Sequence, residues 1–115
     1  MSKTEVYKKE LAKLSEVFKD VEEPKRQLVE GLIQDAAFLM AENSVLKELL
    51  GETGMIKVHP QHKDLQKPTE AARQYLKNVN SYSVVIKTLN GILQKNTVEA
   101  DDEFDEFMNE MRNNV

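Results

Sequence analysis

The side chains best suited to chemistry gather in one stretch, Gly51 to Lys67, which reads GETGMIKVHPQHKDLQK. Its basic and hydrogen-bond-donating residues are Lys57, His59, His62, Lys63 and Lys67. Side chains of these types bind phosphate oxygens. A metal site formed by His59, His62 and Asp64 is the weaker alternative, because three ligands in one loop lack the second anchor of most zinc sites. We expect a basic functional loop that holds neither a metal nor a cofactor.

Residues for catalysis do not form a recognisable set in this sequence. Cysteine is absent, and both histidines lie in one loop without the spacing of a catalytic triad. The acidic run that begins at Asp101 does not fit a calcium-binding EF-hand loop, since Glu106 occupies the position of the required glycine and Arg112 that of the required glutamate. There is no glycine-rich phosphate-binding loop either. We therefore assign no catalytic residue and do not expect an enzyme.

The longest regular apolar pattern lies directly after the loop, in residues Thr69 to Lys95. Its members alternate at steps of three and four residues, as on one face of an α-helix: Ala72, Tyr75, Val79, Tyr82, Ile86, Leu89 and Leu93. The pattern continues through the weak helix former Gly91, which favours one continuous helix. Such a helix spans about 40 Å and needs an equally long helix, or copies of itself, beside it.

A second long helix is predicted before the loop, from about Lys25 to Leu50, with Gly51 as its stop. Its apolar seam consists of Val29, Leu32, Ala36, Leu39, Leu46 and Leu50. The seam is interrupted at Asn43, which could be buried and fix the register between subunits or could face solvent beside Glu42. We favour the solvent-facing interpretation of Asn43.

The N-terminal region predicts one shorter helix, residues 4 to 19, with Thr4 as its N-cap and Leu11, Leu14 and Phe18 on one side. Its lysines alternate with Glu5, Glu10 and Glu16, which favours a solvated face over a binding one. The predicted organisation is an N-terminal helix in residues 1–24, a helical hairpin in 25–95 with the basic loop 51–67, and an acidic tail in 96–115.

Composition and charge favour an elongated all-α protein that completes its core by self-association. Hydrophobic residues make up 40% of the chain and charged residues 31%, which is polar for a compact monomer. The formal net charge of -4 is distributed unevenly along the sequence, because residues 55–95 are strongly basic and residues 96–115 strongly acidic. Without cysteine, a signal-peptide pattern or a long apolar run, the chain is expected to be soluble and cytosolic.

The acidic tail has an apolar side of its own, formed by Phe104, Phe107, Met108 and Met111 at helical spacing. These side chains could bind in the groove of a partner protein, or they could fold back onto the core of the chain. Both interpretations stay open at this point.

Four stretches, in order, carry a resemblance to a known family: LIQDAAFLMAENSVLKELLGETG, MIKVHPQHKDLQ, AARQYLKNVNSYSVVIKTLNGIL and DDEFDEFMNEM. This order resembles the small subunit of the terminases that package DNA into tailed bacteriophages, over about residues 25 to 110. The resemblance implies a non-enzymatic protein of the host bacterial cytoplasm that assembles into a ring through its long helices. It also implies binding to viral double-stranded DNA at the packaging start and recruitment of the large subunit, which carries the ATPase and nuclease.

The resemblance also implies a role for particular residues of this sequence. Contacts between subunits would fall on Leu32, Leu39, Leu46, Tyr75, Val79, Tyr82, Ile86, Leu89 and Leu93. DNA contacts would fall on Lys57, His59, Lys63, Lys67, Arg73, Lys77 and Lys87, or on the N-terminal lysines. The large subunit would dock on Asp101, Phe104, Phe107, Met108 and Met111.

One departure from the family concerns the N-terminus. Many relatives carry a separate helix-turn-helix there, whereas residues 1–24 hold only one helix, so sequence-specific groove reading is not expected from this region. A ring multiplies a weak basic patch by its copy number, and phosphate contacts alone can then give salt-dependent affinity. The alternative function is a helical adaptor, a dimer or tetramer that works only through protein contacts.

Overall fold

The computed structural model describes the backbone of residues 1–113 and the side chains of residues 1–95, 106 and 108–111. This described part of the chain is mainly helical, and its helices pack against each other. The elements in order are α1 (Lys3–Val17), α2 (Lys25–Thr53), β1 (Ile56–Val58), β2 (Gln66–Pro68) and α3 (Glu70–Asn113). No helix in the described residues is both long and apolar enough to cross a membrane.

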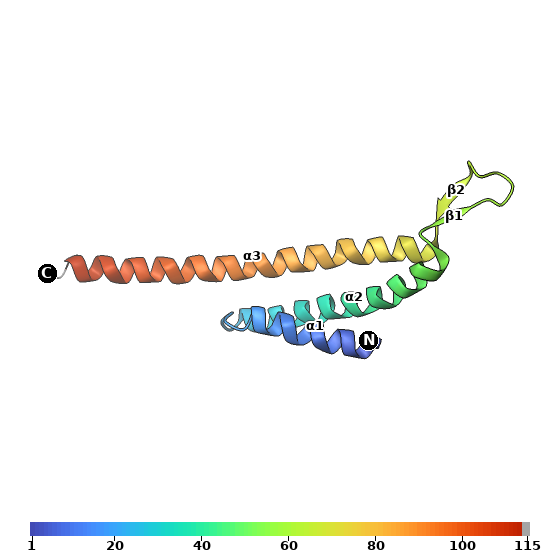
Figure 1. The fold of residues 1–115 in the computed structure, drawn as a ribbon. Helices are drawn as coiled ribbons and strands as arrows, with labels where there is room; N and C mark the ends of the chain where they lie inside the picture. The colour runs from blue at the N-terminus through green and yellow to red at the C-terminus, as the bar shows by residue number, and fades with distance from the viewer. Residues whose placement is uncertain (114–115) are drawn as a thin grey trace.

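The molecule is a long rod with a projection at one end. It measures 85 × 31 × 18 Å, and its radius of gyration is 21.7 Å, against about 13 Å for a compact domain of similar length. α1 packs along α2, and α2 runs antiparallel to the first half of α3 (Figure 1). The β1–β2 hairpin projects where α2 meets α3, while the second half of α3 extends past the α1–α2 turn with no helix beside it (Figure 1).

Helix boundaries are set by side-chain caps and by one glycine. The Ser2 hydroxyl accepts the N–H of Glu5 at 3.2 Å, so Ser2 caps α1 in place of the expected Thr4. α2 continues through Gly51 and ends after Thr53, because Gly54 has a φ of 75°. Such left-handed geometry disfavours other residues, and it makes Gly54 the stop rather than Gly51.

α3 is one helix that passes through Gly91 and continues beyond Lys95 to Asn113. The acidic tail, predicted to begin at residue 96 as a region separate from the helical hairpin, is therefore a continuation of α3 as far as Asn113. Residues 96–113 contain neither proline nor glycine. The remaining weak helix formers cost only fractions of a kcal/mol each, which is too little to end a helix.

The hydrophobic core lies where all three helices meet. Its fully or nearly buried members are Leu14, Phe18, Val21, Val29, Ile33, Ala36 and Leu89. Leu89 has 0% of its surface exposed within the single chain, which corrects its assignment to a contact between subunits. Leu32, Tyr82, Ile86 and Leu93 also pack against this core. Much of the seam predicted on α3 thus serves to hold α1 and α2.

A cluster of amide side chains fixes the register of α2 against α3. Asn43 is only 7% exposed, and its Oδ1 accepts the Nδ2–H of Asn78 at 2.9 Å. The Oδ1 of Asn78 in turn accepts the Nε2–H of Gln74 at 2.8 Å. The solvent-facing interpretation of Asn43 was therefore wrong. A buried amide pair is satisfied at one register of the two helices, so Asn43 sets register inside the chain.

A second polar contact ties α1 to α3. Glu10 is 7% exposed rather than part of a solvated face, and its Oε1 accepts the hydroxyl proton of Tyr82 at 2.7 Å. Burial, followed by this hydrogen bond and the carboxylate charge, raises the pKa of Tyr82 to about 12. Nearer the N-terminus, an ion pair between Lys3 and Glu42 joins α1 to α2.

Candidate nucleic-acid interface

The predicted basic loop is an ordered β-hairpin. β1 and β2 are antiparallel, with Lys57 opposite Lys67 and Val58 opposite Gln66. Beyond the strands, the N–H of His59 donates to the carbonyl of Leu65 at 3.0 Å, which continues the ladder to the tip. At the base, the N–H of Thr69 donates to the carbonyl of Met55 at 2.9 Å. The hairpin therefore leaves the helices as one unit with a defined register.

The hairpin has two chemically different faces. Because side chains alternate along a strand, Lys57, His59 and Lys67 fall on one face, which we call the cationic face. Ile56, Val58 and Pro68 fall on the opposite face, which we call the apolar face. Every residue of both strands is exposed. A solvent-exposed two-stranded hairpin is marginal by itself, so this one depends on its anchor between α2 and α3 or on a partner.

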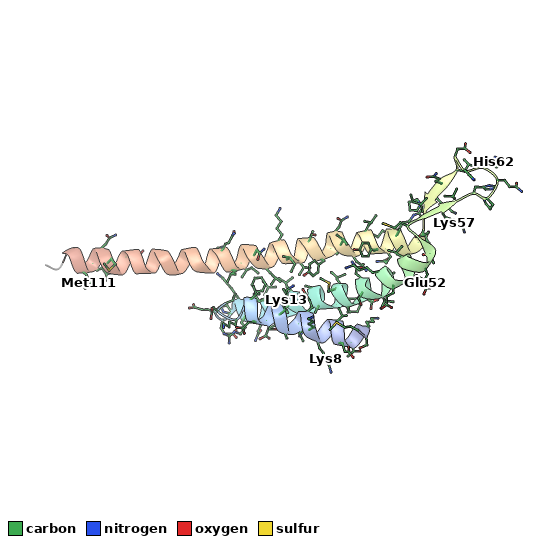
Figure 2. The ribbon with its side chains drawn as sticks, viewed as in Figure 1. Lys8, Lys13, Glu52, Lys57, His62 and Met111 are labelled. Carbon is green, nitrogen blue, oxygen red and sulfur yellow. The ribbon has the colours of Figure 1, made fainter. Side chains whose placement is uncertain are left out.

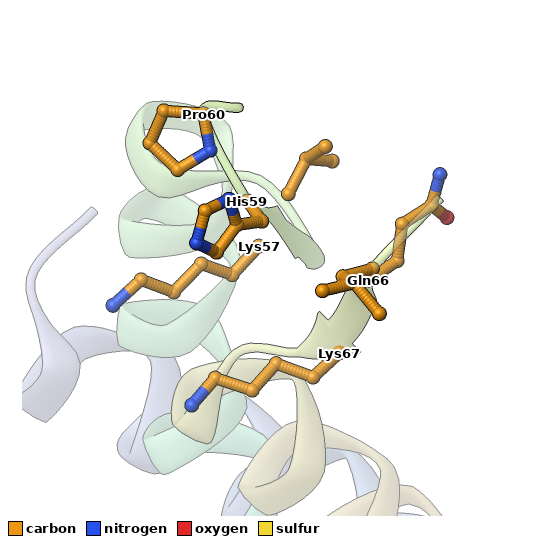
Figure 3. A pocket seen from close by; sticks show the side chains of 7 residues that line it. Lys57, His59, Pro60, Gln66 and Lys67 are labelled. Atoms are coloured by element: carbon orange, nitrogen blue, oxygen red, sulfur yellow. The ribbon is translucent and has the colours of Figure 1, made fainter. Parts of the chain in front are cut away.

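The charges of the cationic face have no ion-pair partner among the described residues. Lys57 and Lys67 lie directly opposite each other in the ladder, an arrangement in which like charges destabilise a sheet. Neither ammonium group forms an ion pair with a described residue. Figure 3 shows both side chains leaving their strands in the same direction, with the His59 ring next to Lys57. The two lysines thus concentrate positive charge on one small surface.

The His59 ring is held in a fixed orientation by hydrogen bonds from the backbone of the hairpin tip. Its Nδ1 accepts the backbone N–H groups of Gln61 and His62, each at 3.1 Å. In the neutral ring the proton must then sit on Nε2. The rings of His59 and His62 lie 5.1 Å apart. Among the described residues, no three His, Cys, Asp or Glu side chains are grouped closely enough to hold a metal ion.

The other predicted DNA contacts form a basic stripe on α3. Arg73, Lys77 and Lys87 are exposed and lie on one side of the helix, within a sector of about 80° at 100° per residue. Residues 71–95 contain no aspartate or glutamate, and Glu70 at the helix start pairs with Arg73 at 3.3 Å. The stripe begins where the hairpin is attached, so the two basic surfaces are adjacent.

Lys63 lies at the tip of the hairpin, in the turn closed by the N–H of Leu65 and the carbonyl of His62 at 2.9 Å. Asp64 follows it directly in the chain. Figure 2 shows the hairpin residues Lys57 and His62 at one end of the molecule and Met111 at the other, with Lys8 and Lys13 on α1 between them.

The residues proposed to dock a large subunit lie in the last turns of α3. Met108 and Met111 are exposed on this part of the helix. The side chains of Asp101, Phe104 and Phe107 lie outside the described residues. The prediction that this face binds a partner therefore stays a prediction.

The remaining predicted subunit contacts lie beside the amide cluster. Leu39, Tyr75 and Val79 line a small hollow of about 100 Å³ between α2 and α3, and Leu46 is half-buried. The apolar seam predicted for α2 does not include a more exposed set of residues, Phe38, Val45 and Leu49, which we call the α2 stripe. Its spacing of seven and four residues was the available signal, but it was hidden by the wide apolar surface of this helix.

The chain was compared with protein-family models, with curated proteins and with solved structures, and none of these comparisons found a match.

Proposed function

We propose that the chain is the non-catalytic small subunit of a phage terminase, acting in the cytoplasm of the host bacterium. It would oligomerise, bind viral double-stranded DNA to start genome packaging, and recruit the large subunit that carries the ATPase and nuclease. The observation that carries the proposal is the adjacency of the cationic hairpin face and the basic stripe of α3. Both are basic, although the formal net charge of the chain is -4.

Charge distribution explains why an acidic protein would bind DNA. Affinity for a duplex depends on cations near phosphates, and it is opposed by carboxylates only where these lie close to the contact. The region from residue 71 to 95 has none, and Glu70 just before it pairs with Arg73. The strongly acidic end of α3 is remote in sequence from the hairpin, so most of the negative charge of this helix is kept away from the proposed contact.

Assembly into many copies is the second part of the proposal. The α2 stripe of Phe38, Val45 and Leu49 is apolar and exposed, as expected of a surface that a second chain covers. A ring would present one basic surface per subunit to the same duplex, which raises the total affinity without new contacts. The acidic end of α3 would remain clear of the DNA and available to the large subunit.

Binding of a labelled duplex, followed by fluorescence anisotropy at several salt concentrations, tests the DNA part. We expect the logarithm of the affinity to fall linearly with the logarithm of the salt concentration. Charge reversal of Arg73, Lys77 and Lys87 should abolish binding, whereas reversal of Lys8 and Lys9 on α1 serves as the control and should change little. Absence of duplex binding at low salt, or equal loss in the α1 control, would contradict the proposal.

Deletion of residues 99–115 separates the recruitment step from the others. The shortened chain should keep its oligomeric mass and its duplex affinity while losing the large subunit in a pull-down. If the deletion dissolves the oligomer, the end of α3 has a structural role and the docking assignment is wrong.

A second candidate function is a helical adaptor that works through protein contacts only. The α2 stripe favours it, because exposed apolar side chains serve any protein partner equally well. The adaptor hypothesis predicts a dimer or tetramer that does not retain duplex DNA. Substitution of Phe38 by Ser should then end partner binding without an effect on any DNA assay.

A further inference from the structure

We propose that the cationic face of the hairpin is a binding site for one phosphate group, held by the ammonium groups of Lys57 and Lys67 and by the Nε2–H of His59. The inference rests on the proposed function and deepens it, because the phosphate belongs to the backbone of a DNA duplex. It assigns phosphate binding to these three residues and not to Lys63, which is equally basic and lies on the same hairpin.

The first argument is the register of the two strands. Lys57 and Lys67 are cross-strand partners, so their side chains leave the sheet within about 5.5 Å of each other on one face. In the free chain this proximity is unfavourable, since each ammonium repels the other. An anion placed between them turns the repulsion into two charge-assisted hydrogen bonds. Lys63 lies at the tip, beside Asp64, and has no such partner.

The second argument is the orientation of His59. Two backbone N–H groups occupy its Nδ1, which leaves the Nε2–H as the donor that the ring offers outward. His59 lies two residues from Lys57 and therefore on the same face (Figure 3). The neutral ring can donate to a phosphate oxygen from this position. A third donor is thus fixed in place by the turn that shapes the hairpin tip.

The third argument is the space available. Lys57, His59 and Lys67 border a hollow of about 350 Å³, which is lined also by Pro60 and Leu65 and by Val58 and Gln66 of the opposite face, and no carboxylate is among its lining residues. Glu70 lines the adjoining hollow at the hairpin base, together with Lys57 and Lys67. Its Oε1 is engaged by the Nη1 of Arg73 at 3.3 Å. The hollow therefore offers an anion positive charge and donors, with no carboxylate among the residues that line it.

The chemistry of the site indicates phosphate binding rather than base reading. Lysine is a point charge without the planar fork that reads a base edge, and the amide of Gln66 belongs to the opposite face of the hairpin. Contacts to the backbone position a protein on DNA but carry no sequence information. We therefore expect the hairpin to contribute equally to the binding of duplexes of any sequence.

The test compares hairpin variants of the full chain in salt-dependent duplex binding. Lys67→Gln should weaken binding about tenfold and lower the slope of log affinity against log salt by about 1. Lys63→Gln removes the same charge from the same hairpin and should have a much smaller effect. Lys67→Arg, which keeps the charge, should retain most of the affinity. Helix content measured by circular dichroism checks that each variant is folded.

The role of His59 is tested by two isosteric replacements. Asparagine places an oxygen near the position of Nδ1, so His59→Asn keeps an acceptor for the tip but lacks the outward donor. Glutamine places its amide near the position of Nε2 and can supply that donor. We expect His59→Asn to weaken duplex binding several-fold and His59→Gln to weaken it less. The opposite order would remove the Nε2–H of His59 from the site.

A titration of the labelled protein with inorganic phosphate, followed by the backbone amide signals of the hairpin, separates the inference from the proposed function. Shifts confined to residues around Lys57 and Lys67, and lost in Lys67→Gln, support the phosphate site even if the chain binds no duplex. If instead the chain binds duplex DNA while Lys63→Gln and Lys67→Gln weaken it equally, the function stands and the specific site is overturned. Unchanged binding in all hairpin variants overturns it as well.

Discussion

Polar side chains from different elements meet in two regions of this molecule, with opposite results. Between the helices, Asn43 meets Asn78, and Glu10 meets Tyr82, each through a hydrogen bond of ordinary length. In the hairpin, Lys57 and Lys67 are cross-strand partners, and both side chains are positively charged. The helix contacts pair a donor with an acceptor inside the chain, whereas the two lysines have no ion-pair partner among the described residues, and we propose that an external anion supplies one. The difference distinguishes residues that stabilise the fold from residues that we propose to bind a partner.

The energetic cost of burial explains the difference. A buried polar atom without a partner costs about 1–3 kcal/mol, and every buried side-chain nitrogen or oxygen among the described residues has a hydrogen-bond partner. The ammonium groups of the hairpin are exposed and solvated, so their mutual repulsion costs little. Substitutions should therefore change unfolding when they fall between the helices and binding when they fall in the hairpin.

The largest effect is expected from the core where the three helices meet. Leu89→Ala leaves a cavity at a side chain that is 0% exposed, and it should lower the free energy of unfolding by about 3 kcal/mol. Leu76→Ala is the matched control, because Leu76 lies on the same helix but is half exposed. Urea denaturation followed by circular dichroism measures both. Equal effects would show that Leu89 is not part of the core.

A smaller effect is expected from the amide cluster. Asn43→Ala leaves the Nδ2 of Asn78 without its acceptor, which should cost about 2 kcal/mol. Replacing both residues by leucine should restore much of this stability while weakening the control of register between α2 and α3. A double-mutant cycle measures the coupling. A coupling near zero would mean that the two amides do not depend on each other.

The contact between α1 and α3 should respond to pH. Because the pKa of Tyr82 is raised from 10.0 to about 12, the folded chain keeps the phenol proton in a range where the unfolded chain has lost it. Stability from this contact is thus complete below pH 10 and is lost as the pH rises toward 12. Glu10→Gln should lower the pKa of Tyr82, since it removes the carboxylate charge, although burial remains. Ultraviolet titration of tyrosinate, with Tyr82→Phe as the control, measures the shift.

The smallest effect on stability is expected in the hairpin. Lys67→Gln removes the repulsion with Lys57 and should change the free energy of unfolding by less than about 0.5 kcal/mol, in the stabilising direction. The same variant is expected to lose duplex affinity about tenfold. A variant that is clearly destabilised would indicate that Lys67 has a structural contact within the chain, and the comparison between the two regions would fail.

The sequence predicted the helices well because their apolar periodicity is strong. It could not predict that Asn43 and Glu10 are buried, because polar residues carry no sign of their partners until the helices are placed together. Gly51 and Gly54 are both plausible stops for α2 in sequence, and only the backbone geometry distinguishes them. The abrupt change in charge after Lys95 suggested a boundary, but helix propensity continues unbroken and determines the structure.

The sequence identified the residues of the candidate site but not their positions relative to one another. Composition identified Lys57, His59, Lys63 and Lys67 as one basic loop. The cross-strand pairing of Lys57 with Lys67, and the turn that orients His59, depend on a hairpin register that short strands do not specify by sequence alone. Leu89 was assigned to subunit contacts because a helical seam looks the same whether its partner is in the same chain or another.

Native mass spectrometry of the chain mixed with duplex DNA tests the central claim most directly. We predict a single closed assembly of many copies that retains one duplex and loses it as the ammonium acetate concentration is raised. A monomer, dimer or tetramer that retains no duplex at low salt would contradict the terminase assignment and favour the adaptor.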